Sequence, residues 1–242
     1  MDVRKFDSVE ALNQAAAAMI IEAVKETPHL VLGLSTGNSP IGVYQRLIAD
    51  HRENGTSYKE VTTFNLDEYE GLDENSPQSY RYFMNEQLFD HLDIAKENTH
   101  VPSGVGDLAE NCKEYERLIE AAGGIGIQLI GIGTNGHIAF NEPGTSFESL
   151  THIADLSQET IDANAKYFPS PGDIPSRAIS MGIQSIMNAR KVIMVAFGQS
   201  KARAVKEMLE GPVSTELPAS VLQGHPDAII LLDREAASLL SN

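Results

Sequence analysis

The chain has 242 residues, of which 42% are hydrophobic, and a formal net charge of −16 at pH 7. So acidic a chain is poorly suited to bind nucleic acid or an anionic membrane surface, and none of its segments approaches the ~20 apolar residues of a membrane span. The single cysteine, Cys112, excludes an intramolecular disulfide and is typical of a reducing cytosol. Because the first residues carry no signal-peptide pattern, we expect a cytoplasmic protein.

Helical and strand patterns alternate along the chain, which predicts an α/β fold of three layers, Rossmann-like, with an open, mostly parallel sheet between helices. No repeat or long linker interrupts the alternation, so we expect residues 1–242 to form one domain. In chain order the expected elements are a helix at 9–26, a strand at 30–34, a helix from Pro40, a strand at 61–66, helices at 79–92 and 107–122, strands at 127–131, 150–155, 177–181 and 191–197, a helix at 200–210, a strand at 227–232 and a helix at 234–240.

The most distinctive stretch is Gly-Ile-Gly-Thr-Asn-Gly-His-Ile-Ala-Phe-Asn-Glu-Pro-Gly at 131–144. Its glycines match the dinucleotide-binding pattern G-x-G-x-x-G, which needs a long helix directly afterwards. Pro143 comes too early for that helix, although Asp155 lies near the distance of a ribose-binding acid. Proton transfer by His137 and Glu142 is the stronger hypothesis. Metal binding by this pair lacks a third ligand with recognisable spacing.

Polar residues also follow other predicted strands, where ligands of open parallel sheets bind. The first strand leads into Thr36, Gly37, Asn38 and Ser39, whose small side chains leave backbone amides open to a phosphate. Simple helix capping by Ser39 is the alternative. Lys201 follows a predicted N-cap, Ser200, and a cation there opposes the helix dipole unless an anion is bound beside it. A solvated lysine is the alternative.

Asp67 and Glu68 end a strand that should be buried. Desolvation would raise the basicity of a carboxylate at this position, which suits a general base. The alternative is that Asp67 caps a turn and Glu68 is exposed.

Taken together, these segments resemble the glucosamine-6-phosphate deaminase family over essentially the whole chain. The resemblance implies conversion of glucosamine 6-phosphate and water to fructose 6-phosphate and ammonia, with a small amino-sugar phosphate as the partner, no cofactor and no metal. The segments that carry it are Leu32–Pro40, Phe64–Tyr69, Gly136–Pro143 and Ser200–Ala202.

The resemblance also implies roles for individual residues. His137 would open the sugar ring, a proton transfer that suits a histidine of near-neutral pKa, with Glu142 and Asn135 assisting. Asp67 would move the proton between carbons 2 and 1. The residues expected to bind the phosphate are Thr36, Gly37, Asn38, Ser39, Lys166 and Lys201.

Several positions depart from the family pattern. Asn135 replaces an aspartate of some members and cannot carry charge. Asn38 replaces the second glycine of the usual Thr-Gly-Gly-Thr-Pro loop, and we expect its tolerance of positive φ to preserve the loop. Lys166 replaces an arginine and keeps the charge without the bidentate fork. A basic pair of the allosteric members, which have a longer C-terminus, falls on His152 and Ala154, so we expect no allosteric activation and a monomer rather than a hexamer.

Two further functions are compatible with parts of this pattern. A 6-phosphogluconolactonase or another sugar-phosphate isomerase has a similar fold but lacks the Asp-Glu-Tyr segment at 67–69. A catalytically silent sugar-phosphate sensor would need a DNA-binding module, for which this acidic chain has no room. It would also have no use for His137, Glu142 and Asp67 together.

Overall fold

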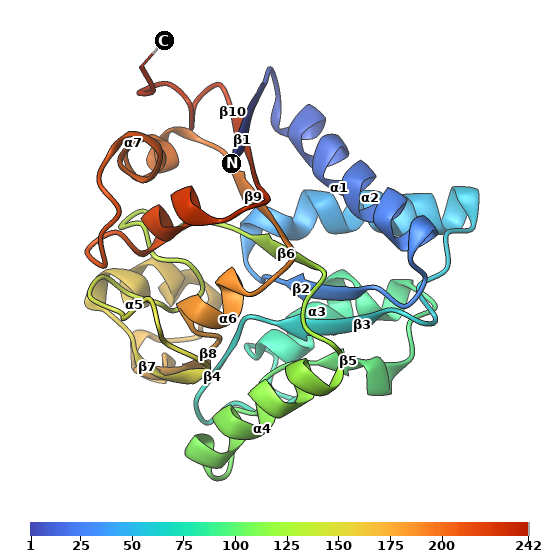
Figure 1. Ribbon diagram of the computed structural model, residues 1–242. Helices are drawn as coiled ribbons and strands as arrows, with labels where there is room; N and C mark the ends of the chain where they lie inside the picture. Colours follow the sequence, from blue (N-terminus) through green and yellow to red (C-terminus); the bar gives the residue numbers. More distant parts are fainter. Residues whose placement is uncertain (242) are drawn as a thin grey trace.

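The structure, a computed structural model, describes residues 1–241 and is organised around a seven-stranded sheet (Figure 1). Every pairing within this sheet is parallel. The strand order is β1 (Asp2–Phe6), β10 (Ala228–Asp233), β9 (Lys191–Ala196), β6 (Ile127–Ile130), β2 (Val31–Leu34), β3 (Thr62–Asn65) and β5 (Thr99–His100).

Two apolar cores lie on opposite faces of this sheet, because alternate residues of each strand point to opposite sides. In β2, for example, Leu32 and Leu34 join one core and Val31 the other. One face is covered by α1 (Val9–Glu26), α2 (Asn38–Asn54) and α3 (Tyr80–Gln87), and the other by α4 (Leu108–Ala121), α6 (Ile183–Met187), α7 (Ala202–Glu210) and the 3₁₀ segment Pro218–Gly224. The three-layer parallel arrangement predicted from the sequence is confirmed.

A second, three-stranded antiparallel sheet was not predicted. It has the order β4 (Asp67–Tyr69), β8 (Arg177–Ser180) and β7 (His152–Asp155), and it lies with α5 (Gln158–Asn164) beyond the ends of the main strands (Figure 1). Leu66 joins the two sheets, since its N–H donates to Leu34 O at 3.0 Å and its carbonyl accepts from Met181 N at 2.6 Å. Asp67 is therefore the first residue of the second sheet, and it lies just beyond the carboxyl end of β3 in the main sheet.

The two ends of the chain differ from expectation. The first residues form the edge strand β1, whose exposed, charged side chains hide the strand pattern. The prediction of a helix at 234–240 is wrong, because these residues form turns. Asp233 Oδ1 accepts from Ala236 N at 2.7 Å, as an N-cap does, but Ser238 N and Leu240 N donate to the carbonyls three residues before them, so no α-helix continues from this turn. Within residues 1–241, each helix is too short or too polar to cross a lipid bilayer.

Candidate active site

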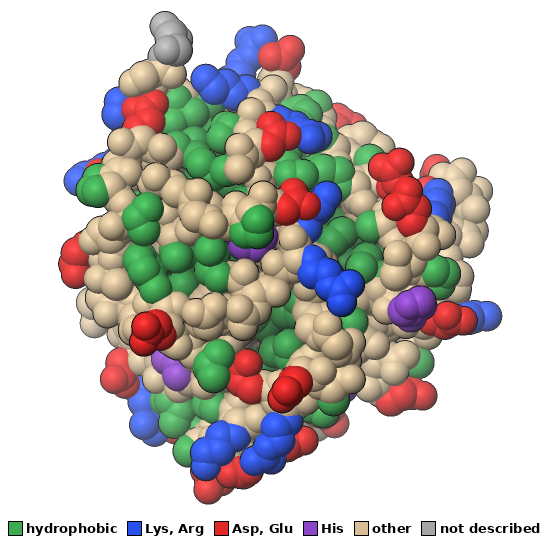
Figure 2. Space-filling view, in the orientation of Figure 1, with side chains coloured by type: hydrophobic (Ala, Val, Ile, Leu, Met, Phe, Trp, Pro, Cys, Tyr) green, Lys and Arg blue, Asp and Glu red, His purple; other side chains and the backbone are tan. Residues whose placement is uncertain are grey.

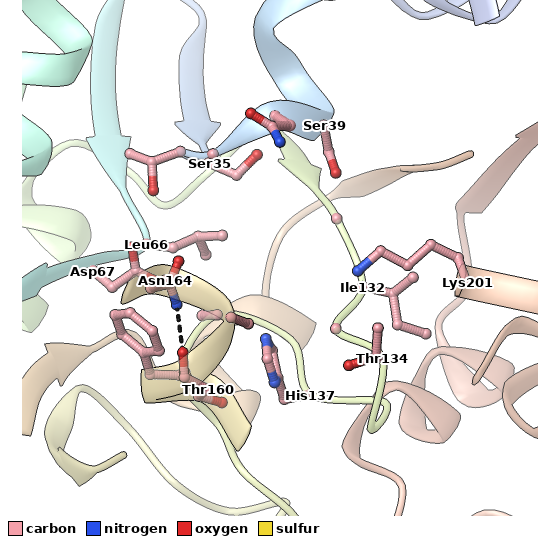
Figure 3. A pocket seen from close by; sticks show the side chains of 18 of the residues that line it. Ser35, Ser39, Leu66, Asp67, Ile132, Thr134, His137, Thr160, Asn164 and Lys201 are labelled. Atoms are coloured by element: carbon pink, nitrogen blue, oxygen red, sulfur yellow. Dashed lines mark hydrogen bonds between the residues drawn. The ribbon is translucent and has the colours of Figure 1, made fainter. Parts of the chain in front are cut away.

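A cavity of about 400 Å³ opens where the sequence placed its candidate residues. Its walls are the segments that follow β2, β3, β6 and β9, and α5 with the residues after it closes one side. Figure 3 shows Asp67 on one side of the cavity, Lys201 on the other, and His137 between them. All six residues expected to bind phosphate line it: Thr36, Gly37, Asn38, Ser39, Lys166 and Lys201.

The start of α2 presents backbone amides to this cavity. Its N-cap is Gly37, with φ +82° and no side-chain hydrogen bond, so capping by Ser39 is wrong. The first N–H groups of a helix have no acceptor within the helix and are available to an anion. The positive φ of this loop falls on Gly37, whereas Asn38, whose tolerance of positive φ was expected to preserve the loop, is the first residue of the helix. Asn38 Oδ1 instead accepts from Tyr167 Oη at 3.1 Å.

Two lysines face the same cavity. Lys201 ends the short 3₁₀ turn Gln199–Lys201, whose N-cap is Gly198 and not Ser200 as predicted. Burial lowers the pKa of the Lys201 ammonium, and the nearby charge of Lys166 lowers it further, against an opposing effect of Glu159. Two ammonium groups that repel each other are stabilised by an anion between them. On the face shown in Figure 2, basic side chains are scattered among acidic ones.

Asp67 is 6% exposed and faces the cavity from the start of β4. Burial, with a smaller contribution from the charge of Glu68, raises the pKa of Asp67 to about 8. A carboxylate of that basicity can accept a proton from carbon near neutral pH. Glu68 is only 2% exposed, so the alternative of an exposed Glu68 is wrong.

His137 is held by the glycine turn after β6. Gly133 N donates to His137 O at 2.9 Å, and the imidazole occupies the space beside Gly133, where a Cβ would lie 2.4 Å from His137 Cε1. Burial lowers the pKa of His137, which Glu142 opposes and Lys201 reinforces. The ring is therefore uncharged at neutral pH and can accept a proton.

Glu142 and Asn135 lie behind His137, outside the cavity lining. Glu142 Oε2 lies 3.8 Å from His137 Nδ1 and accepts from Asn135 Nδ2 at 2.9 Å, while Oε1 accepts from the Thr160 hydroxyl and from Ser157 Oγ at 3.1 Å. Burial acts to raise the pKa of Glu142, but these hydrogen bonds and the His137 ring lower it below its ordinary value. Glu142 is thus a fixed, ionised carboxylate.

Sequence reasoning missed the contribution of α5 and the aromatic wall. Ser157 is the N-cap of α5 and its Oγ accepts from Thr160 N at 3.2 Å, so the local sequence indicates only the start of a helix. Tyr80 and Phe140 also line the cavity, with ring centroids 6.1 Å apart and an interplanar angle of 14°. Tyr80 begins a helix that contains several aromatic residues, and that pattern by itself carried no signal for this role.

The dinucleotide hypothesis is contradicted by the backbone after the glycines. Residues 131–151 form turns and the isolated bridge Ile138↔Asn141, with no helix to face a pyrophosphate. No group of three or more His, Cys, Asp or Glu side chains within the described residues is placed to hold a metal ion.

Comparison with known proteins adds to this geometry. A family model described as glucosamine-6-phosphate isomerases/6-phosphogluconolactonase matches residues 4–230. The chain is 50% identical over 232 residues to a glucosamine-6-phosphate deaminase of Geobacillus sp. (strain WCH70), covering 96% of this chain and 92% of the relative. It is 48% identical over 240 residues to the deaminase of Shouchella clausii (strain KSM-K16), covering 99% and 97%.

Solved structures show similarity to proteins of the same two kinds. A monomeric glucosamine-6-phosphate deaminase superimposes with a TM-score of 0.97 at 46% identity, covering 99% of this chain and all of the other. A 6-phosphogluconolactonase from Trypanosoma brucei superimposes with a TM-score of 0.81 at 19% identity, covering 99% and 98%, which shows a shared fold.

Proposed function

Because this chain belongs to the family of glucosamine-6-phosphate isomerases and 6-phosphogluconolactonases, we propose on that premise that it is the enzyme that converts glucosamine 6-phosphate and water to fructose 6-phosphate and ammonia. Relatives that are 47–50% identical over nearly the whole chain carry the deaminase name. One observation in the site carries the chemistry: a buried, basic carboxylate and Lys201 occupy opposite sides of one cavity that Lys166 also lines, with an uncharged imidazole between them.

The substrate orientation follows from charge. The phosphate binds at the start of α2 between Lys201 and Lys166, where backbone amides and two ammonium groups face the cavity. The sugar then extends toward Asp67. Side chains of α5 close one side of the cavity around the sugar.

Ring opening is the first step. His137 accepts the proton of the anomeric hydroxyl and returns it to the ring oxygen. Glu142 stabilises the imidazolium that forms for a moment, because its carboxylate lies 3.8 Å from Nδ1. Asn135 assists by holding Glu142 and the backbone of His137 in place.

Proton transfer along the opened chain follows. Asp67 removes the proton from carbon 2 while the oxygen on carbon 1 takes up a proton from the substrate's ammonium group, which gives an enolamine. Asp67 then delivers its proton to carbon 1, which gives the iminium ion of the ketose. Water then adds at carbon 2, and ammonia leaves. The raised pKa of Asp67 suits both halves of this transfer, since the carboxyl group must first take up and then release a proton.

A lactonase is the second candidate, since the family includes 6-phosphogluconolactonases. Lactone hydrolysis requires no proton shift between carbons, and therefore no use of Asp67 as a base on carbon. The lactonase structures compared here are 16–21% identical and indicate the fold alone. The deaminase is the function that uses Asp67, His137 and the two lysines together.

Four accompanying properties are part of the proposal. We infer that the chain is a monomer, as the solved deaminase of the same fold is, that it works in the cytoplasm, and that the reaction, a hydrolysis of a carbon–nitrogen bond, needs no metal. We also infer that residues 1–242 fold as one domain. Light scattering coupled to gel filtration tests the first inference against the expected 26.3 kDa.

The decisive experiment is an assay of the purified protein with glucosamine 6-phosphate in buffer containing EDTA. Ammonia and fructose 6-phosphate should appear in equal amounts. The variant Asp67→Asn should lose turnover by a factor of about 10² or more and lose exchange of the carbon-2 proton with deuterated solvent, while phosphate still binds. The exposed Asp73→Asn is the matched control. Absence of turnover by the wild-type protein would exclude the function.

A further inference from the structure

Asp67 and Glu68 are consecutive buried carboxylates that line different cavities. Asp67 faces the active-site cavity, whereas Glu68 lines a second cavity of about 270 Å³ together with Arg81. Successive residues of a strand point to opposite sides, which explains the separation. The proposed mechanism uses Asp67 and assigns nothing to Glu68. A buried carboxylate without a role is unusual, because removing its charge from water is costly.

Glu68 closes the N-terminus of α3. Its Oε1 accepts from Tyr69 N and from Tyr80 N, both at 2.9 Å, and its Oε2 accepts from Arg81 N at 3.0 Å. Ser79 Oγ accepts from the next amide of the helix. The free amides of this helix start are thus satisfied by β4 and the N-cap residue.

Tyr80 connects the Glu68 carboxylate to the active-site cavity. Tyr80 is the first residue of α3, its N–H binds Glu68, and its side chain lines the cavity beside Phe140. One carboxylate therefore fixes the strand that carries Asp67 relative to the helix that carries an aromatic wall of the site.

We propose that Glu68 is a positioning residue for the base Asp67: it ties β4 to α3 and places a second buried negative charge behind the base. The proposal rests on the role of Asp67 under "Proposed function". It deepens that role, because the basicity of Asp67 then depends on a residue that never touches substrate.

The groups around the pair support this assignment. Burial raises the pKa of Glu68 to about 7, although three backbone N–H groups and the Arg81 guanidinium stabilise its negative charge. Burial and the charge of Glu68 raise the pKa of Asp67 to about 8, so Glu68 ionises first. The other ionisable side chains that are influenced by the Asp67 charge are tyrosines, which stay neutral there: Tyr44 on α2, Tyr69 on β4, Tyr80 on α3 and Tyr115 on α4.

Two variants separate the effect of the Glu68 charge from the effect of its side-chain length. Glu68→Gln removes the charge and keeps the length, and Glu68→Asp keeps the charge but withdraws it from α3. The measurement is kcat/KM for glucosamine 6-phosphate from pH 5.5 to 9.5. Glu60→Gln, an exposed site with the same change of net charge, is the control. The ionisation of the substrate is common to all variants, so differences between them report on the enzyme.

With Glu68→Gln we expect the acid limb, on which activity rises with pH, to move about one unit toward lower pH, the usual size of such shifts. With Glu68→Asp the limb should stay in place while kcat/KM falls severalfold at every pH. A folded Glu68→Gln whose limb matches the wild type would overturn the charge role. Should Glu68→Gln fail to fold, wild-type activity in Glu68→Asp would overturn the proposal by itself.

The same data distinguish this inference from the function on which it rests. An inactive wild-type protein, or an active Asp67→Asn variant, contradicts the proposed function or the proposed base. An active wild type with an inactive Asp67→Asn and an unmoved limb in Glu68→Gln contradicts only the role of Glu68.

Discussion

The side chain of Asn135 joins the two partners of the ring-opening pair. Its Nδ2 donates to Glu142 Oε2 at 2.9 Å, and its Oδ1 accepts from His137 N at 3.1 Å. The amide contributes both a donor and an acceptor and no charge, so Glu142 can remain ionised without repulsion from this neighbour. Asparagine in place of the family aspartate therefore favours the ionised form of Glu142.

Replacing Asn135 with aspartate should make that consequence measurable. Asn135→Asp puts a second carboxylate 2.9 Å from Glu142 Oε2, and two carboxylates in one site raise the pKa of one of them. We expect activity within about tenfold of the wild type and an additional titration in the acid limb of kcat/KM. Asn135→Ala, which removes both hydrogen bonds without adding charge, should lower activity and leave the number of titrations unchanged. An unaltered profile in Asn135→Asp would contradict this account.

Gly133→Ala should displace the imidazole of His137. A Cβ on Gly133 would lie 2.4–2.5 Å from three ring atoms of His137, closer than real contacts allow. The backbone of Gly133 is not left-handed, so alanine adds no conformational strain. We expect kcat/KM to fall by about tenfold or more, since small displacements of catalytic groups are costly. Gly224→Ala, where a Cβ meets open space, is the control. Normal activity in Gly133→Ala would show that the ring has room to move.

Asp67→Asn should make the folded protein more stable at alkaline pH. Burial raises the pKa of Asp67 from 3.8 to about 8, so the folded state holds this proton more tightly than the unfolded chain does. Its contribution to stability is complete below the unfolded pKa and is lost as the pH rises through 8. Asparagine removes that dependence. The thermal midpoint of Asp67→Asn should exceed that of the wild type by several degrees at pH 9, and the difference should disappear at pH 4. A variant that is less stable at pH 9 would contradict the raised pKa.

Lys201→Met and Lys166→Met should weaken phosphate binding more than catalysis. Lys201 lines the side of the cavity opposite Asp67, and Lys166 lines the same cavity. A charged hydrogen bond to phosphate contributes about 1.5–3 kcal/mol. We therefore expect KM for glucosamine 6-phosphate to rise about tenfold or more, with a smaller change in kcat. Lys166→Arg, in contrast to Lys166→Met, should keep phosphate binding, because it keeps the charge and adds donors. Lys113→Met, on the exposed face of α4, is the control. Equal losses of kcat and kcat/KM would instead place a lysine at the reacting carbons.

Much of the site could be predicted from the sequence because its residues follow strands of a parallel sheet. Hydrophobic periodicity is a local property, and the carboxyl ends of parallel strands meet at one edge. That rule alone predicts that one site contains Thr36–Ser39, Asp67, His137 and Lys201, and all of them line one cavity. The glycine turn was also interpreted correctly as something other than a nucleotide site, because Pro143 excludes a long helix there.

What only the tertiary structure decided depends on partners distant in the chain. β4 pairs with β8 more than 100 residues later, which makes Asp67 and Glu68 the start of a second sheet and buries both carboxylates. Their basicity and the attachment of Glu68 to α3 arise from that burial, and the hydroxyl groups that fix Glu142 come from α5. The sequence by itself determined which chemical groups are present and at which edge of the sheet they gather. Desolvation and hydrogen bonding between remote segments determine their charge, and these exist only in the folded chain.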